Sequence, residues 1–241
     1  FAPTNEISLS SKKKGDVLIF DQLCRDIYRS VECCDTEKEA FKSFINRLEV
    51  WSDFFKKRGI RSMSYESQVG LFGELTFLQK VISLTDSFEA LTAWIGPKNA
   101  LHDFIFPSCT VEVKTTTSGE AKIHTRPGQL SPEYENLFIC LVRLEASDLG
   151  QDLMTKVNCI SEELSEEALD LFRDLLTSAG YTEMDKEYYK KNKFDIIELK
   201  FFLVEEGFPT INFDSLPKAI TEVNYSLDLK LCDDFSTEPE K

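Results

Sequence analysis

The feature that most constrains the fold is a change in the spacing of apolar residues, from a helical period before Gly96-Pro97 to a strand-like period after it. Residues 70–84 carry apolar side chains at helical spacing. After Gly96-Pro97 the chain continues in short alternating runs separated by turn signals such as Ser118-Gly119. This order predicts a helix followed by a three-stranded meander, with strands over 101–107, 109–117 and 121–125.

Glu74 lies within the apolar face of the predicted helix. At about 100° per residue its side chain falls between Leu78 and Val81. A carboxylate that points inward is costly unless it meets a cation, a hydrogen-bond donor or a metal. The helical pattern by itself leaves two ordinary explanations open, an ion pair and a position at a solvated edge of the helix.

The strand over 109–117 brings an acid and a base to one side of the sheet. Period-two alternation puts Glu112 and Lys114 on the face opposite Val111 and Val113. Glu and Lys are common residues, so a Glu-x-Lys triplet alone carries little information. The order is more informative: a helix with an inward Glu, then a strand that begins near Asp103, then a strand with Glu-x-Lys.

This order resembles the PD-(D/E)XK superfamily of metal-dependent nucleases, whose core is a helix, a three-stranded meander, a helix and a strand. The matching residues are HDF at 102–104 and EVK at 112–114, with His102 where the superfamily name has Pro. The motifs GLFGEL, WIGP, HDFIF, VEVKTT, GQL, GFPTINF and LPKAITEVNYSLDL are similar to those of a bacterial family known only as PD-(D/E)XK motif proteins. The similarity runs from about residue 64 to residue 232.

The resemblance implies an α/β fold with a mixed sheet and a restriction-endonuclease-like core over residues 61–241. Residues 1–60 are expected to form a mainly helical N-terminal extension, with a short strand at 5–11. The polar residues from Cys232 onward are expected to be loose. The remaining helices are expected at 17–31, 36–59 and 161–180, and the remaining strands at 135–145, 194–206 and 224–231.

A divalent metal site follows from the resemblance and from the chemistry of the residues. Hard oxygen ligands suit Mg²⁺ or Mn²⁺, which activates a water and stabilises the charge that develops when a phosphodiester is hydrolysed. Asp103 and Glu112 would be the primary ligands, with the Val113 carbonyl as a third. Glu74 would act through a bound water or a second metal. Lys114 would orient the attacking water or neutralise the developing charge.

Two further residues are candidates for the rim of the site. Gln129 is one, because some members of the superfamily carry a Gln soon after the core Lys. Its other interpretation is a plain turn residue beside Pro127 and Gly128. His102 is the second candidate, although strand alternation predicts that it faces away from the side of Asp103.

The charge balance argues against a nucleic-acid enzyme. The formal net charge is -14, whereas affinity for nucleic acid comes largely from Lys and Arg beside phosphates. Basic runs at 12–14, 56–58 and 190–193 could form a positive face, or a partner subunit could supply the basic surface. Seven cysteines without a C-x-x-C pair and two histidines make a structural zinc site a poor explanation for this chain.

The chain is expected to be cytoplasmic and to have no membrane partner. No apolar stretch approaches the roughly 20 residues needed to cross a bilayer, and the first residues lack the pattern of a signal peptide.

The function that these patterns favour is a Mg²⁺-dependent deoxyribonuclease, an endonuclease that acts in a restriction or phage-defence setting by analogy with related families. Two alternatives stay open. One is a catalytically silent or partner-dependent module that binds nucleic acid or protein on a nuclease fold. The other is a nuclease for RNA or single strands, in which Phe104 and Phe106 would be stacking platforms. The sequence does not fix the number of chains in the assembly.

Overall fold

The chain divides into two compact units in the computed structural model, one ending at Asp53 and the other beginning at Phe54. The boundary lies inside a helix, seven residues before the expected end of the N-terminal extension, and the division into domains at residue 60 stays a prediction. The structure describes residues 9–10, 17–32, 34–58, 62–98, 100–131, 134–211, 216–217 and 219–238.

The N-terminal unit contains α1 (Val17–Glu32) and most of α2 (Glu37–Arg58), which confirms the two helices predicted there. The carboxylate of Asp26 in α1 accepts hydrogen bonds from the Arg47 guanidinium and, at 2.7 Å, from the Trp51 indole N–H in α2. These bonds join the two helices of this unit. The expected strand at 5–11 lies outside the described residues except for 9 and 10, which form no strand.

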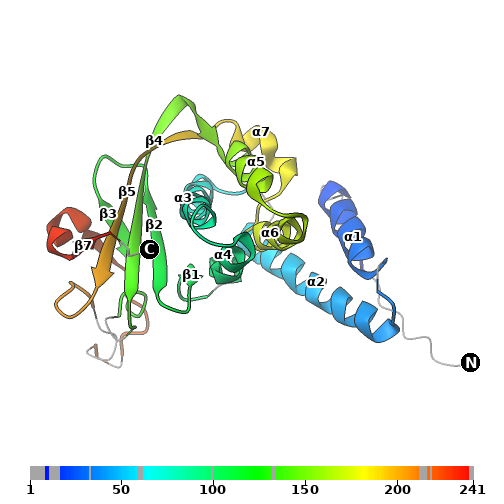
Figure 1. Cartoon of the computed structure of the whole chain (residues 1–241), viewed down its shortest axis with the longest axis horizontal. Coiled ribbons are helices and arrows are strands. Elements are labelled where there is room, and N and C mark those ends of the chain that lie inside the picture. Colours follow the sequence, from blue (N-terminus) through cyan, green and yellow to red (C-terminus); the bar gives the residue numbers. More distant parts are fainter. Residues whose placement is uncertain are drawn as a thin grey trace, which may run out of the picture. The chain divides into compact units, whose positions relative to one another are not determined.

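The second unit is built on a five-stranded sheet with the strand order β1-β2-β4-β5-β7 (Figure 1). β2 pairs with β4 in parallel, and the other neighbours in this sheet are antiparallel. The predicted mixed α/β fold is therefore confirmed. The strands are β1 (Phe104–Ile105), β2 (Thr110–Thr116), β4 (Leu137–Asp152), β5 (Lys193–Val204) and β7 (Ser236–Thr237).

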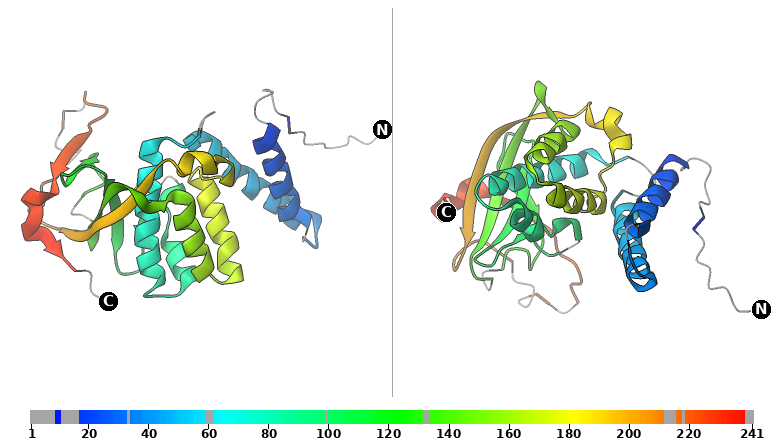
Figure 2. Two further views of the ribbon diagram at one scale, coloured as in Figure 1. Left: turned by 90° about the horizontal axis from the view of Figure 1, so that it is seen from above. Right: turned by 45° about the vertical axis from the view of Figure 1, so that its right-hand side comes forward.

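Helices α3 to α6 cover one face of this sheet, and the long pair β4–β5 curves over them (Figure 2). No described helix is both long enough and apolar enough to cross a membrane. The helices of this unit are α3 (Tyr65–Ile82), α4 (Ser87–Ala93), η1 (Gly96–Lys98), α5 (Leu153–Glu163), α6 (Glu166–Ser178), η2 (Glu183–Asp185), α7 (Lys186–Tyr189) and η4 (Leu229–Phe235).

The predicted three-stranded meander is wrong in its third strand. β3 (Lys122–Thr125) does not pair with β2 but forms a separate two-stranded sheet with β6 (Tyr225–Asp228). β4 pairs with β2 over its whole length and so takes the edge expected for the third strand, while β1 pairs with only the first two residues of the other edge. The sequence analysis expected β3, the next strand along the chain, to pair with β2. The more distant β4 takes that place and pairs with β2 in parallel.

The helix predicted over 161–180 is two helices. Ser161 is not its cap but lies in the last turn of α5, and Leu164 has an extended backbone that ends α5. Ser165 caps α6 by accepting a hydrogen bond from the Ala168 N–H at 3.4 Å. Gly180 follows α6 with φ of 88°, as the prediction required of a residue after the last turn.

Two other boundaries differ from the predictions. β1 has two residues instead of seven, because the bend at residues 101–103 precedes it. The residues after Cys232, expected to be loose, are ordered through residue 237. They complete η4 and then pair with β5 as β7.

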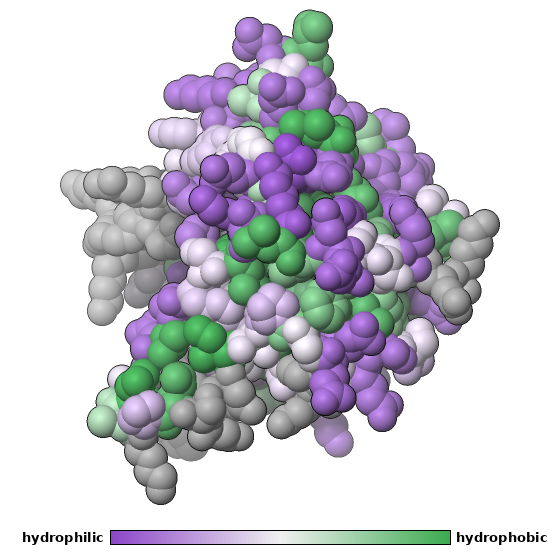
Figure 3. Space-filling model, turned by 90° about the vertical axis from the view of Figure 1, so that its left-hand side faces the viewer, coloured by the Kyte–Doolittle hydropathy of each residue, from purple (hydrophilic) through white to green (hydrophobic). Residues whose placement is uncertain are grey.

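The first half of β4, residues 137–144, is largely buried on both faces, which explains its nearly continuous apolar sequence. Its side chains alternate between a cluster beneath the helices and a second cluster beneath β3, β6 and η4. The outer surface on the side of β3 and β7 intersperses hydrophobic with hydrophilic residues (Figure 3). Cys140, Val142 and Leu144 belong to the first cluster, and Leu137, Ile139 and Leu141 belong to the second.

Close packing of α3 on β2 depends on Gly73. A Cβ built on this residue would collide with the Thr115 side chain of β2. The close approach therefore needs a residue without a side chain at this position.

We expect Gly73→Ala to destabilise the fold by about 1–3 kcal/mol, because α3 must move away from β2. Gly70→Ala on the same helix is the matched control, since a Cβ there meets nothing within 4 Å. That control should be neutral or gain up to about 1 kcal/mol from better helix propensity. Urea unfolding of both variants tests this, and equal stabilities would contradict the packing argument.

Candidate active site

The candidate site lies at the edge of β2 that β1 leaves unpaired, just beyond the N-terminal end of β1. Asp103 stands in the bend just before β1, not within a strand as predicted, and its Oδ2 accepts a hydrogen bond from the Val113 N–H at 2.8 Å. β1 is too short to pair with this part of β2. The N–H and C=O of one strand residue point to the same edge, so the Val113 carbonyl also faces the side of Asp103.

Glu74 reaches the same place from α3. Its Oε2 accepts a hydrogen bond from the indole N–H of Trp94 at 2.8 Å. A Cβ at Gly96 would stand 2.8 Å from Asp103 Oδ1 and 3.0 Å from Glu74 Oε2. The two carboxylates therefore face one small volume, which the missing side chain of Gly96 leaves open. A hydrogen-bond donor, one of the partners expected for an inward Glu74, is present as Trp94.

Glu112 is the most deeply buried carboxylate of the predicted set, with 2% of its surface exposed. Its Oε1 lies 2.7 Å from Lys114 Nζ and accepts a hydrogen bond from Gln129 Nε2 at 2.9 Å. Its Oε2 is also buried and has no hydrogen-bond partner among the described residues. Burial raises the pKa of Glu112 and the charge of Lys114 opposes this, while Glu74 raises the pKa further. A bound cation would satisfy Oε2.

Gln129 is part of this network. Its Oε1 lies 3.4 Å from Lys114 Nζ and 3.3 Å from Thr125 Oγ1, in addition to the bond from its amide to Glu112. The turn interpretation is also correct, since the Gln129 N–H donates to the Arg126 carbonyl and Gly128 has φ of 95°. The turn is what carries the Gln129 side chain to the strand acid and base.

His102 supports the loop of Gln129. It is 3% exposed, and its Nε2 lies 2.9 Å from the Gln129 carbonyl oxygen. Its ring packs edge-on against Tyr134 at a centroid distance of 4.8 Å. Burial lowers the pKa of His102. Strand alternation does not apply to His102, because residues 101–103 form a bend and not a strand.

The residues fit a divalent metal in their chemistry. Within the part of the chain that the structure describes, no three His, Cys, Asp or Glu side chains are gathered closely enough to hold a metal by themselves. Mg²⁺ is commonly bound by one or two carboxylates and keeps several waters. A set of Asp103, Glu112 and the Val113 carbonyl is of this kind, and the unsatisfied Glu112 Oε2 is the observation that favours it.

The sequence analysis missed Trp94 and Arg126. Trp94 lies in the WIGP motif and donates to Glu74, but no pattern in the sequence indicates this bond. Arg126 is exposed on the turn that leads to Gln129, and its charge lowers the pKa of Glu112. Phe104, a stacking platform under the alternative of a nuclease for RNA or single strands, is fully buried between Trp94 and Phe106.

A mixed sheet that gathers helix and strand carboxylates beside a strand lysine defines a nuclease-like fold with a restriction-endonuclease-like core. The chain belongs to the family described as "Putative PD-(D/E)XK family member, (DUF4420)", whose model matches residues 2–230. The resemblance inferred from the sequence is therefore confirmed. PD-(D/E)XK nucleases generally use divalent metals. No curated protein and no solved structure matches the chain.

Removal of the Lys114 ammonium from its buried pair with Glu112 should destabilise the protein. We expect Lys114→Met to cost about 3 kcal/mol in the absence of divalent metal, because the Glu112 carboxylate then stays buried without its partner. Adding Glu112→Gln should recover most of this loss. Chemical denaturation of the two single variants and the double variant measures the coupling.

Lys190→Met is the control for this cycle. It breaks a pair of the same kind with Glu187 at 2.8 Å, but this pair is exposed and should contribute little. A Lys114→Met variant as stable as the control would show that the buried pair is not coupled as described.

Proposed function

We propose that this protein is a metal-dependent nuclease that hydrolyses phosphodiester bonds of DNA and cuts within the strand, with Mg²⁺ or Mn²⁺ as its cofactor. The observation that carries the proposal is the buried Glu112 Oε2, which lacks a hydrogen-bond partner although Oε1 of the same carboxylate is bound to Lys114 and Gln129. A carboxylate held in this way has one oxygen ready for a cation.

The carboxylates of Asp103 and Glu112 and the carbonyl of Val113 would hold the metal, and Glu74 would act through a water that it orients. When bound, the metal supplies an activated water and stabilises the charge on the phosphoryl oxygens. Trp94 keeps the Glu74 carboxylate turned toward Asp103 through its hydrogen bond at 2.8 Å.

Lys114 would contact the substrate directly. Its ammonium has three donors. Lys114 Nζ lies 2.7 Å from Glu112 Oε1 and 3.4 Å from Gln129 Oε1, and these two contacts use two of the donors. The remaining donor can reach the attacking water or a phosphoryl oxygen, where a positive charge is most effective in the transition state. Gln129 would position Glu112 and Lys114 without touching the substrate.

The negative charge of the chain needs local compensation if DNA is the substrate. Arg126 provides a cation beside the site, and no hydrogen bond or ion pair within the described residues engages its guanidinium. The predicted basic run at 190–193 lines a separate pocket, where Lys190 is paired with Glu187. Other subunits with basic surfaces, the restriction or phage-defence setting and the cytoplasmic location stay predictions.

A second candidate function is a catalytically silent binding module. The observation that favours it is that the described acidic side chains are not gathered tightly enough to hold a metal by themselves. Calorimetric titration with Mg²⁺ and Mn²⁺ separates the two proposals, because a silent module would bind neither ion at this site.

Cleavage of plasmid, linear duplex and single-stranded DNA tests the proposed activity. We expect cutting that depends on Mg²⁺ or Mn²⁺ and falls about a hundredfold or more in Asp103→Ala and Lys114→Ala, because each removes a group that acts on the reacting phosphate. Asp170→Ala and Lys190→Ala remove exposed side chains and should cut as the wild type does. Full activity in Asp103→Ala would refute the assignment of the site.

The role of Arg126 predicts a change in salt dependence. Arg126→Ala should weaken DNA binding and lower the slope of log K against log salt concentration by about one, since one phosphate contact is lost. Arg173→Ala on the exposed face of α6 is the control. Fluorescence anisotropy over a range of salt concentrations measures both slopes, and identical slopes would exclude a phosphate contact by Arg126.

A further inference from the structure

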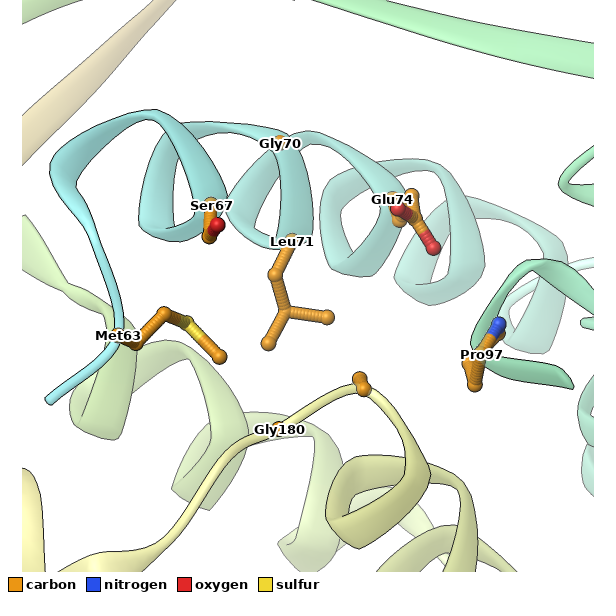
Figure 4. Close-up of a pocket in the computed structure, with 8 residues that line it drawn as sticks. Met63, Ser67, Gly70, Leu71, Glu74, Pro97 and Gly180 are labelled. Atoms are coloured by element: carbon orange, nitrogen blue, oxygen red, sulfur yellow. The ribbon is translucent and has the colours of Figure 1, made fainter. Parts of the chain in front are cut away.

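A pocket of about 270 Å³ opens beside Glu74. It lies between the N-terminal half of α3 and the chain that follows α6 (Figure 4). Ser67 and Leu71 extend into it from α3, and Gly180 lies opposite them. Pro97 lines its other end near Glu74, so the pocket and the candidate active site share the Glu74 side chain.

We propose that this pocket receives the base of one nucleotide of the strand that is cut, the nucleotide next to the phosphate that the metal held by Asp103 and Glu112 would contact. This inference rests on the proposed nuclease function and extends it. It implies that the protein acts on a strand whose base can leave the stack, either in single-stranded DNA or by extrusion from a duplex.

The size of the pocket favours a single base. Its volume of about 270 Å³ lies just below the range of roughly 300–1,000 Å³ that is usual for larger organic ligands. A double helix is far too wide to enter, so the part of DNA that fits the pocket is a base out of the stack.

The chemistry of the walls also favours a base over a phosphate. None of the described residues that line the pocket is Lys or Arg, so the pocket offers no cation to a phosphate group. Met63, Leu71 and Pro97 present apolar surface to the face of a ring, and a methionine sulfur packs well on aromatic rings. Apolar contacts of this kind do not depend on which of the four bases is present.

Among the described residues that line the pocket, polar side chains stand at two positions. Ser67 Oγ accepts a hydrogen bond from Ser64 Oγ at 3.1 Å, which leaves the hydrogen of its own hydroxyl for a ligand. Glu74 stands at the end of the pocket next to the active site. A base in the pocket therefore has a hydroxyl donor at its edge, and its phosphate is directed toward the carboxylates.

Filling the pocket from α3 tests the inference. A Cβ at Gly70 meets nothing within 4 Å, so the side chain of Gly70→Leu begins in open space at the pocket. Ser67→Leu fills it from an exposed position one turn earlier. Gly119→Leu is the control, because its Cβ also meets nothing within 4 Å and Gly119 does not line the pocket. Thermal unfolding verifies that all three variants fold.

Binding is measured by fluorescence anisotropy with single-stranded oligonucleotides in EDTA, so that no cleavage occurs. We expect about tenfold weaker binding for Gly70→Leu and Ser67→Leu, the magnitude of losing one base contact, and wild-type binding for Gly119→Leu. An oligonucleotide in which every nucleotide is abasic should bind the wild type more weakly than the intact strand and show no further loss in the filled variants.

Two results separate this inference from the proposed function. Filled variants that bind as tightly as the wild type, with the same response to abasic nucleotides, would overturn the base pocket even if the wild type cuts DNA. A wild type that binds with the expected abasic response but does not cut with Mg²⁺ or Mn²⁺ would overturn the nuclease activity and leave the pocket standing.

Discussion

Burial of the Glu112 carboxylate beside β4 is the constraint on which the rest of the site depends. An ionised carboxylate in such a place requires a cation and hydrogen-bond donors, because desolvation otherwise favours its neutral form. Lys114 and Gln129 supply both to one oxygen. Gln129 is in turn held by the buried His102. The loop after β3, the bend before β1 and the strand lysine are thus joined through one buried group.

The shortness of β1 gives the second half of the site. Because β1 stops pairing after two residues, the edge of β2 at Val113 is free for the Asp103 carboxylate. Gly96 leaves room for Glu74 to approach the same place, and Gly73 lets α3 lie close enough to β2 for this approach. A longer β1 would have paired the Val113 N–H and C=O within the sheet and removed both from the site.

An acidic chain can still act on nucleic acid if some of its cations stand where phosphates bind. In the proposed function Lys114 and Arg126 have this position, since the charges of both act on Glu112, whereas no described residue that lines the pocket beside Glu74 is a cation. This separation of charged and apolar surfaces on the two sides of the carboxylates is the physical basis for proposing that a phosphate binds on one side and a base on the other.

The sequence by itself determined the helix with Glu74, the strand with Glu112 and Lys114, and the family, because these depend on local periodicity and short motifs. Only the tertiary structure decided which strand pairs with β2, since pairing in parallel with β4 joins residues far apart in the chain. It also decided the roles of Gln129, His102 and Trp94. Their hydrogen bonds form between separate segments, and no spacing within one segment can encode such contacts.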